Sequence, residues 1–127
     1  MEQRFDRREI FNRASLLLGD EALERLAGAR AAVFGIGGVG SWAAEALART
    51  GVGSLTLVDA DRVSVTNINR QAPATALTVG EPKVEAMARR LLEINPGLEL
   101  ELVNGRYTAE TADGFDLGAY DAVIDAI

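Results

Sequence analysis

The sequence predicts an α/β fold: a Rossmann-like, doubly wound and mainly parallel sheet, preceded by N-terminal helices. Short aliphatic runs alternate with amphipathic segments along the chain, which is typical of parallel strands joined by crossover helices. A glycine-rich turn follows the first aliphatic run, and an acidic residue ends the second. Both features occur in the nucleotide-binding versions of this fold. The length of 127 residues suits one compact domain.

Local patterns predict each element. Leucines at helical spacing predict helices at 6–18 and 20–28, with Asp20 as the N-cap of the second. Aliphatic runs predict strands at 31–34, 54–59, 98–103 and 122–127. Apolar residues on one face predict helices at 38–50 and 81–94, and a weaker pattern predicts one at 108–117. Residues 60–80 have no clear period, so we expect an ordered, functional loop there.

The predicted elements divide the chain into two parts. Residues 1–28 form an N-terminal helical segment, and residues 29–127 form the nucleotide-binding domain. A sheet truncated after about four strands would have an uncovered last edge. We therefore expect the sequence to be the N-terminal fragment of a longer enzyme, inactive by itself.

The composition excludes several kinds of chemistry. The sequence has no cysteine and no histidine, which excludes disulfides, thiolate zinc sites and Ser-His-Asp triads within it. A net charge of −6 disfavours broad binding to nucleic-acid phosphates. No apolar run approaches the roughly 20 residues of a membrane span. The charged first eight residues lack the apolar stretch of a secretory signal, so a cytoplasmic protein without a membrane partner is expected.

The glycine-rich turn at 35–40 predicts a nucleotide site. Gly35 allows a tight turn, Gly37 and Gly38 let the backbone approach a phosphate, and Gly40 permits close packing of helix and strand. The first N–H groups of the following helix offer positive potential to an anion. Asp59 ends the second strand, in position to accept hydrogen bonds from ribose hydroxyls. NAD(P), FAD and ATP could all use such a turn.

Two cations further along the chain favour ATP. A dinucleotide carries one pyrophosphate, whereas a triphosphate carries more charge, and Arg70 and Lys83 suit its β- and γ-phosphates. Both would also stabilise a pyrophosphate leaving group. A lysine at a helix N-terminus opposes the helix dipole, which favours a functional role for Lys83. We predict Arg70 and Lys83 as the catalytic residues.

Four motifs together resemble the ThiF/MoeB/ubiquitin-activating superfamily, whose members use ATP to adenylate carboxylates. The motifs are residues 35–40, Asp59-x-Asp61, Asn67-x-Asn69-Arg70-Gln71 and Gly80-x-Pro82-Lys83. The resemblance covers nearly the whole chain. Within the superfamily the chain is most similar to the tRNA threonylcarbamoyladenosine dehydratase branch, on residues 37–51, 66–71 and 123–127. Members of that branch activate the carboxylate of the modified base with ATP and close it into a cyclic form.

The resemblance implies a phosphate-binding set. Gly38 and its neighbours, Val39 among them, face the phosphates. Asn69 and Arg70 contact phosphates, and Lys83 stabilises the α-phosphate as the acyl adenylate forms.

The resemblance also implies the remaining ligands and partners. Asp59 binds the ribose, and Asp61 and Asn67 lie near the triphosphate or its metal. Arg7, in the segment Arg4-Phe-Asp-Arg7, reaches the ATP of the partner subunit. The implied cofactors are ATP and Mg²⁺, and the implied assembly is a homodimer. The family's magnesium-binding aspartate normally follows the segment 123–127, so no metal ligand is assigned here.

Alternatives remain at two levels. The adenylated carboxylate belongs either to a modified tRNA nucleoside or to the C-terminus of a ubiquitin-like sulfur carrier. A domain of an NAD(P)-dependent oxidoreductase would leave Arg70 and Lys83 unexplained, and so would a catalytically dead interaction module. Outside the motifs, Trp42 is interpreted as a packing residue, and Arg89 and Arg90 as the solvated face of a helix.

Overall fold

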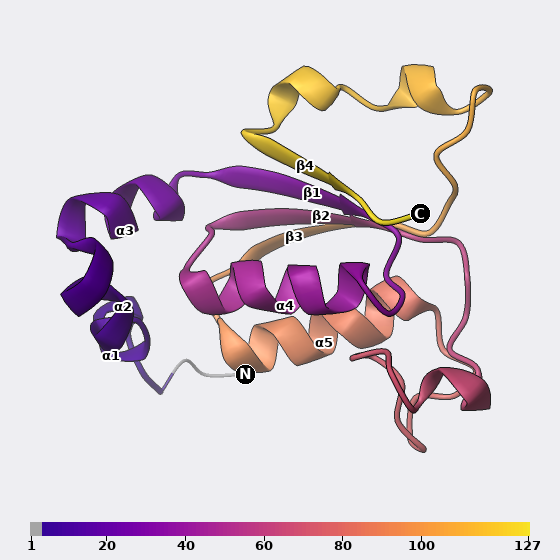
Figure 1. The fold of residues 1–127 in the computed structure, drawn as a ribbon, viewed down its shortest axis with the longest axis horizontal. Helices are drawn as coiled ribbons and strands as arrows, with labels where there is room; N and C mark the ends of the chain where they lie inside the picture. The colour runs from indigo at the N-terminus through magenta and orange to yellow at the C-terminus, as the bar shows by residue number, and fades with distance from the viewer. Residues whose placement is uncertain (1–3) are drawn as a thin grey trace.

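A four-stranded parallel sheet forms the centre of the computed structural model, which describes residues 4–127 (Figure 1). The first three residues of the predicted segment 1–28 lie outside the described residues. The strands are β1 (Arg30–Phe34), β2 (Ser54–Val58), β3 (Glu99–Val103) and β4 (Ala122–Asp125), in the order β3-β2-β1-β4. The predicted fold class is confirmed. The order reverses at β1, which pairs with both β2 and β4, so the switch point of the sheet lies between β1 and β4.

Two long helices cover one face of the sheet (Figure 1). They are α4 (Gly40–Thr50) and α5 (Lys83–Ile94), and the main core lies between them and the strands. Side chains such as Val33, Leu55 and Met87 are fully buried there. Each contributes about 1.5–3 kcal/mol through the apolar area that it removes from water. Helix α4 ends at Gly51, whose φ of 103° is the left-handed conformation that glycine adopts most readily.

Both long helices begin two residues later than predicted. Gly38 and Val39 remain in the turn before α4, and Glu81 and Pro82 remain in the chain before α5. The second difference arises because Glu81 and Pro82 pair with the segment that follows β2: Val63 N donates to Glu81 O at 2.8 Å. The longest helix, α5, has 12 residues. No helix within residues 4–127 is long and apolar enough to cross a membrane.

The other face of the sheet is covered without an α-helix, so the helix predicted at 108–117 is wrong. The structure has two 3₁₀-helices there, η2 (Ala112–Gly114) and η3 (Leu117–Ala119). Thr111 explains the difference, because its hydroxyl bonds to backbone groups of Arg106 and Thr108 and competes with helix formation. The segment is anchored by aromatic rings: Phe34, Tyr107 and Phe115 meet edge to face, with centroids 5.0–5.4 Å apart.

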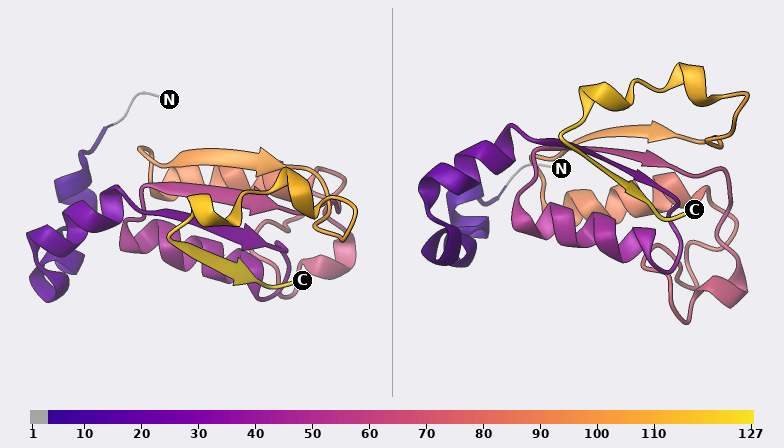
Figure 2. Two further views of the ribbon diagram at one scale, coloured as in Figure 1. Left: turned by 90° about the horizontal axis from the view of Figure 1, so that it is seen from above. Right: turned by 45° about the horizontal axis from the view of Figure 1, so that its top comes forward.

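The N-terminal segment forms three helices, α1 (Arg7–Ile10), α2 (Asn12–Leu18) and α3 (Asp20–Ala27), at the amino ends of the strands. The helix predicted at 6–18 is interrupted at Phe11, whose side chain is buried. Asp20 is not the N-cap. Gly19, with a φ of 87°, is the N-cap. Asp20 lies in the first turn, where its negative charge interacts favourably with the helix dipole. Figure 2 shows these helices at the end of the sheet opposite to the loop between β2 and α5.

Glu45 connects the two long helices. Its carboxylate lies between α4 and α5 and is 7% exposed. It accepts a hydrogen bond from Arg49, one turn along α4, at 3.1 Å, and another from Arg90 of α5. The hydrogen bond from Arg90 holds the pKa of Glu45 below its ordinary value; burial opposes this shift, and Arg49 adds to it. Arg90 is therefore more than a solvated residue, whereas Arg89 is exposed, as predicted, and pairs with Glu81 at the surface.

Replacement of Glu45 by glutamine is expected to lower the free energy of unfolding at neutral pH by about 1–2 kcal/mol. Because the folded-state pKa is lowered, the stabilisation by Glu45 is complete above the unfolded-state value of about 4.3. It is lost as the pH falls through the folded-state value. In Glu45→Gln the free energy of unfolding should therefore fall less steeply as the pH is lowered into the acidic range. Urea unfolding measured from neutral pH down to strongly acidic pH tests this, and parallel acid limbs in the two proteins would contradict it.

Candidate nucleotide-binding site

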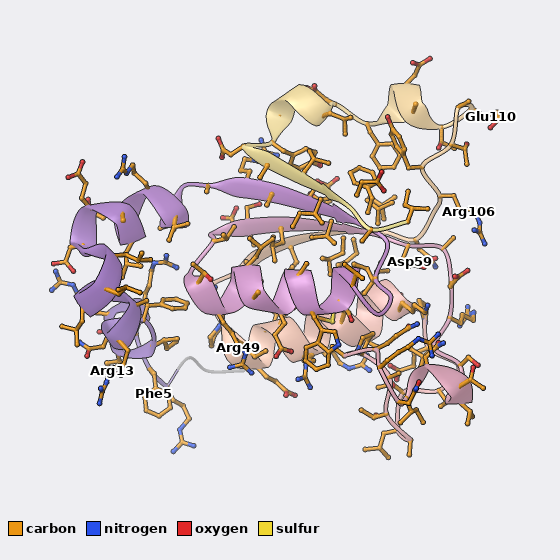
Figure 3. The ribbon with its side chains drawn as sticks, viewed as in Figure 1. Phe5, Arg13, Arg49, Asp59, Arg106 and Glu110 are labelled. Atoms are coloured by element: carbon orange, nitrogen blue, oxygen red, sulfur yellow. The ribbon has the colours of Figure 1, made fainter. Side chains whose placement is uncertain are left out.

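A cavity of about 380 Å³ lies where the carboxyl ends of the four strands meet. Open α/β sheets bind their ligands at this edge, beside the switch point. Figure 3 shows Asp59 and Arg106 at this end of the sheet, on the chain that follows β2 and β3. The walls are formed by residues that follow each strand and by the first residue of α5. They are Phe34, Gly35, Gly37, Val58, Asp59, Ala60, Asp61, Lys83, Gly105, Arg106, Tyr107, Thr108, Ala126 and Ile127.

Two glycines of the turn at 35–40 are required by the protein itself. Gly35 has a φ of 94°, and a Cβ there would lie 2.6 Å from the carbonyl oxygen of Ala126. A Cβ on Gly40 would lie 1.6 Å from the carbonyl oxygen of Gly35. These distances explain the tight turn and the close approach of α4 to β1 that the sequence predicts.

The other two glycines are not required by packing. A Cβ on Gly37 would meet Gln71 Nε2 at 3.7 Å, and one on Gly38 would meet Arg70 Cγ at 3.7 Å. Both are ordinary van der Waals distances, so this chain leaves room for a methyl group at either position. Packing therefore does not require glycine at Gly37 or Gly38, and their bare backbone is open to the approach of a ligand.

The start of α4 offers hydrogen-bond donors. Among residues 4–127, the backbone N–H groups of Gly38, Val39 and Gly40 have no hydrogen-bond partner. The first helical bonds are made by Ser41, to Gly37 O at 3.1 Å, and by Ala43, to Val39 O at 3.0 Å. Unpaired N–H groups at the start of a helix favour a bound anion such as phosphate.

Asp59 connects the glycine turn to the loop after β2. Its Oδ2 accepts a hydrogen bond from Ile36 N at 2.8 Å, and its Oδ1 accepts one from Asp61 N at 2.7 Å. A carboxylate has about four acceptor positions, so both oxygens can still accept hydrogen bonds from ribose hydroxyls. The side chain therefore shapes the cavity wall and remains a candidate ribose ligand.

Lys83 is the more buried of the two cations that line the cavity, the other being Arg106. It is the first residue of α5, its side chain lines the cavity, and it is only 7% exposed. Its backbone N–H donates to Asp61 O at 3.0 Å, but its ammonium has no hydrogen bond or ion pair among the described residues. A buried cation without a partner is costly, and a helix N-terminus increases that cost. An anion in the cavity would offset that cost, so Lys83 is a candidate anion ligand.

Arg106 is a site residue that the sequence-based prediction missed. Its guanidinium donates to Asp61 Oδ1 at 3.2 Å, and both side chains are more than half exposed at the cavity wall. The rule that selected Asp59 would have found Arg106, because both follow a strand at its carboxyl end. The same rule would have found Gly105, Tyr107 and Thr108, which follow the same strand and also line the cavity.

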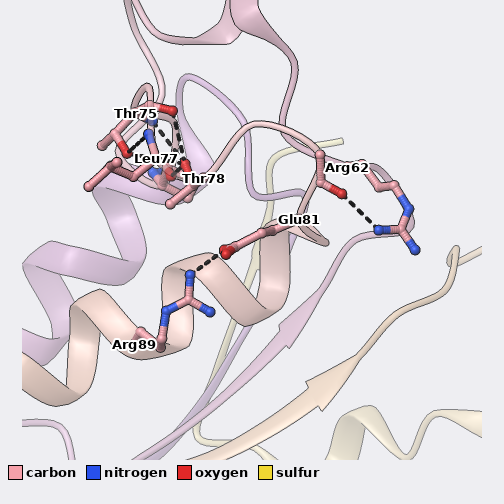
Figure 4. Close-up of polar contacts among 8 residues, drawn as sticks. Arg62, Thr75, Leu77, Thr78, Glu81 and Arg89 are labelled. Carbon is pink, nitrogen blue, oxygen red and sulfur yellow. Dashed lines mark hydrogen bonds and ion pairs between the residues drawn. The ribbon is translucent and has the colours of Figure 1, made fainter.

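The loop between β2 and α5 is held by its own hydrogen bonds, as Figure 4 shows for part of it. Arg62 donates to Gly80 O at 2.8 Å, and the hydroxyl of Thr78 accepts from Thr75 N at 2.9 Å. Asn67 lies inside this network, since its Oδ1 accepts from Ser64 N at 2.9 Å. Asn67 thus supports the loop and does not line the cavity.

Arg70 lies behind the glycine turn and outside the cavity wall. Its methylene carbons stand over Gly38, and its NH1 donates to Thr66 O and Asn69 Oδ1, each at 3.0 Å. The two predicted catalytic residues therefore do not share the cavity. The predicted residues that line it are Gly35, Gly37, Asp59, Asp61 and Lys83, while Gly38, Val39, Gly40, Asn67, Asn69 and Arg70 belong to the turn and the loop beside it.

Arg7 lies at the far end of α4 from the glycine turn. Its guanidinium donates to the carbonyl oxygens of Gly51 and, at 3.3 Å, of Leu23, and it stacks 4.8 Å from the centroid of the Phe11 ring. Burial lowers the pKa of Arg7 from its ordinary value. These contacts connect the N-terminal helices to the end of α4. The predicted contact with the ATP of a second subunit stays a prediction.

Replacement of Arg7 by alanine is expected to lower the free energy of unfolding by about 1–3 kcal/mol, because two part-buried carbonyl groups lose a charged donor. Thermal and urea unfolding of Arg7→Ala measure this loss. Arg8→Ala is the matched control, since Arg8 is exposed on the same helix and should change stability by less than about 0.5 kcal/mol. Equal stability of the two variants would contradict the role of Arg7 in holding the helices.

Comparison with known proteins identifies relatives with the same organisation. The tRNA threonylcarbamoyladenosine dehydratase of Bacillus subtilis is 51% identical over 116 residues, which cover 91% of this chain and 46% of that protein. The molybdopterin-synthase adenylyltransferase of Salmonella typhimurium is 46% identical over 98 residues, which cover 76% of this chain and 39% of that protein. The chain therefore spans about half the length, or less, of the curated relatives that it matches.

A solved structure has the same fold. The Escherichia coli tRNA N6-threonylcarbamoyladenosine dehydratase TcdA, in complex with ATP, is 48% identical and matches with a TM-score of 0.91, over 94% of this chain and 49% of that chain. The model of the ThiF family matches residues 11–127. The resemblance to this family and to its dehydratase branch is thus confirmed. Because the match extends over all the strands and the whole cavity, the chain belongs to the ThiF family.

Proposed function

We propose that this chain is the ATP-binding half of an enzyme that adenylates a carboxylate, with the threonylcarbamoyl group of a modified tRNA adenosine as the substrate. The observation that carries the proposal is Lys83, a largely buried residue whose ammonium has no partner among the described residues. It lines a cavity beside the N–H groups of Gly38, Val39 and Gly40, which are unpaired within residues 4–127. The dehydratase names of the relatives and the ATP in the TcdA structure support the same ligand and substrate.

The chemistry is a displacement at phosphorus. A carboxylate oxygen attacks the α-phosphorus, the bond from that phosphorus to the bridging oxygen of the β-phosphate breaks, and pyrophosphate leaves. Negative charge increases on the phosphate oxygens during this step. We assign Lys83 and the N–H groups of Gly38, Val39 and Gly40 to offset this charge, because donors fixed in place before the reaction need no reorganisation during it.

Arg70 has a different task in this proposal. Its guanidinium lies behind Gly38, where the terminal phosphates of a bound triphosphate would extend past the turn. We therefore assign it to binding the β- and γ-phosphates and to stabilising the pyrophosphate that leaves. Asp59 would hold the ribose, through the acceptor positions that its two backbone hydrogen bonds leave available.

We propose that Mg²⁺ enters with the triphosphate. Mg²⁺ usually keeps several waters and takes one or two carboxylates together with substrate phosphates. Within residues 4–127 no group of three acidic side chains could hold a metal ion. Asp61 is the exposed carboxylate on the cavity wall, and we assign it as one protein ligand of this ion. We also propose a cytoplasmic homodimer, as the family resemblance implies.

The second candidate substrate is the C-terminal carboxylate of a ubiquitin-like sulfur carrier. It is supported by the 46% identity to a molybdopterin-synthase adenylyltransferase, which is lower than the 51% identity to the Bacillus subtilis dehydratase. Both candidates require the same ATP site and the same displacement. They differ in the molecule that presents the carboxylate, which the cavity does not itself select.

The first test is nucleotide-dependent thermal stabilisation with ATP and Mg²⁺, compared with NAD and NADP. A ligand that binds only the folded state raises the melting temperature by mass action. ATP should raise it and the dinucleotides should not. Stabilisation by a dinucleotide alone would overturn the proposal in favour of an oxidoreductase.

The second test identifies the carboxylate. Pyrophosphate release from ATP is measured with tRNA that carries threonylcarbamoyladenosine and, separately, with a sulfur-carrier protein. Release that depends on the modified tRNA is the expected result. Release that depends on the carrier alone would replace the first substrate by the second.

A further inference from the structure

We infer that Trp42 is a positioning residue, which holds Arg70 against the glycine turn through the backbone of Arg70. The inference rests on the proposed ATP site, because it assigns Arg70 to the phosphates. It replaces the interpretation of Trp42 as a packing residue.

Two neighbouring side chains of α4 hold the segment that contains Arg70. Trp42 Nε1 donates a hydrogen bond to Arg70 O at 2.8 Å. Ser41 Oγ accepts one from Ala72 N at 3.1 Å and donates one to Gly37 O. The first turn of α4 is thus hydrogen-bonded to Arg70, to Ala72 and to the glycine turn. Among the described residues, these are the hydrogen bonds that join residues 64–72 to α4.

Burial does not explain Trp42. Its side chain is 48% exposed, unlike the core residues of α4 such as Ala44 and Ala48, which are fully buried. Its ring is instead held from the side of α5 by the Arg90 guanidinium, 5.8 Å from the ring centroid, and Arg90 is bonded to Glu45. The indole is thus exposed but held in one orientation, and its N–H donates to a loop carbonyl. These contacts fit a residue that positions the loop.

The position of the Arg70 backbone determines the position of its guanidinium. The guanidinium bonds to Thr66 O and Asn69 Oδ1, which belong to the same loop, so the loop and the charge move as one unit. Without Trp42, Ser41 would still hold Ala72, but Arg70 itself would lose its connection to α4. We therefore expect the charge to lose its fixed place over Gly38, while the fold and the cavity around Lys83 are retained.

The variant Trp42→Phe keeps an aromatic ring and removes the N–H donor. ATP affinity should fall about fivefold, as expected for one net hydrogen bond. AMP affinity should not change, because AMP lacks the β- and γ-phosphates that Arg70 is proposed to bind. In the background of Arg70→Ala, Trp42→Phe should cause no further loss of ATP affinity, since the two changes remove one interaction. Equal losses for ATP and AMP, or additive losses in the double variant, would overturn the inference.

A second measurement needs no nucleotide. Trypsin cleavage after Arg70, followed by mass spectrometry, reports on how firmly this backbone is held. Cleavage should be several times faster in Trp42→Phe than in the unmodified protein. Leu77→Ala is the control, since Leu77 is 92% exposed in the same loop and is not bonded to α4. Unchanged cleavage in Trp42→Phe overturns the inference, whereas failure of ATP to bind the unmodified protein overturns only the proposed function.

Discussion

Replacement of Gly40 by alanine is expected to destabilise the protein by at least about 3 kcal/mol and, in the extreme, to prevent folding. The added Cβ would lie 1.6 Å from the carbonyl oxygen of Gly35, an overlap that no rotamer can relieve. Gly35 cannot move away easily, because its N–H donates to Val58 O at 2.8 Å within the sheet. Circular dichroism and urea unfolding measure the loss.

Gly38→Ala is the matched control for this prediction. Its Cβ would meet Arg70 Cγ at 3.7 Å, so the free energy of unfolding should change by less than about 1 kcal/mol. ATP affinity should nevertheless fall tenfold or more, on the order of 1.4 kcal/mol, because a methyl group would stand where the phosphates approach the backbone. Two variants of equal stability, or a Gly38→Ala protein that binds ATP like the unmodified one, would contradict the division of the four glycines into structural and ligand-facing pairs.

Replacement of Lys83 by methionine is expected to reduce ATP affinity by roughly 10- to 150-fold, the loss expected for a charged hydrogen bond of about 1.5–3 kcal/mol. Stability without nucleotide should be unchanged or increased, because methionine fills similar space and removes a charge that lies on a largely buried residue and has no partner within residues 4–127. Isothermal titration with ATP and thermal unfolding of the free protein measure the two effects. The combination of weaker binding and equal stability is the signature of a ligand-binding lysine.

The control for Lys83→Met is Arg89→Gln, on the same helix. Arg89 is exposed, pairs with Glu81 and does not line the cavity, so its loss should leave ATP affinity unchanged. The affinity for AMP distinguishes the roles of the two predicted cations. Lys83→Met should lower it, because Lys83 is assigned to the α-phosphate, whereas Arg70→Ala should leave it unchanged. A loss of stability of more than about 2 kcal/mol in Lys83→Met without nucleotide would make Lys83 a structural residue.

Elements with strong local patterns could be predicted from the sequence. The strands and the helices α4 and α5 follow from aliphatic runs and helical spacing, and their existence depends little on distant residues. The failures are local patterns overridden by specific contacts. The predicted helix at 108–117 gives way to 3₁₀ turns, because the hydroxyl of Thr111 bonds to the backbone and Phe115 is anchored on Phe34. Asp20 is displaced from the N-cap by Gly19, which adopts a positive φ.

The candidate site divides in the same way. Asp59 and Lys83 could be selected from the sequence because each stands at an end of a strand or helix that meets the sheet edge. The sequence could not place Arg70 behind Gly38 or Arg7 at the end of α4, because those positions depend on how the loop and the N-terminal helices fold back on the domain. Arg106 could have been selected by the same rule as Asp59, but its pairing with Asp61, 45 residues away, needed the structure.

The sequence by itself determined the fold class, the family and the chemical type of the ligand, because these depend on periodicity and on motifs whose residues are close along the chain. Only the tertiary structure decided which glycines the protein needs for its own packing, which cation enters the cavity and which lies behind the turn. It also decided that Trp42 faces the loop and not the core. The physical reason is that side-chain distances between segments depend on packing, which a one-dimensional pattern does not specify.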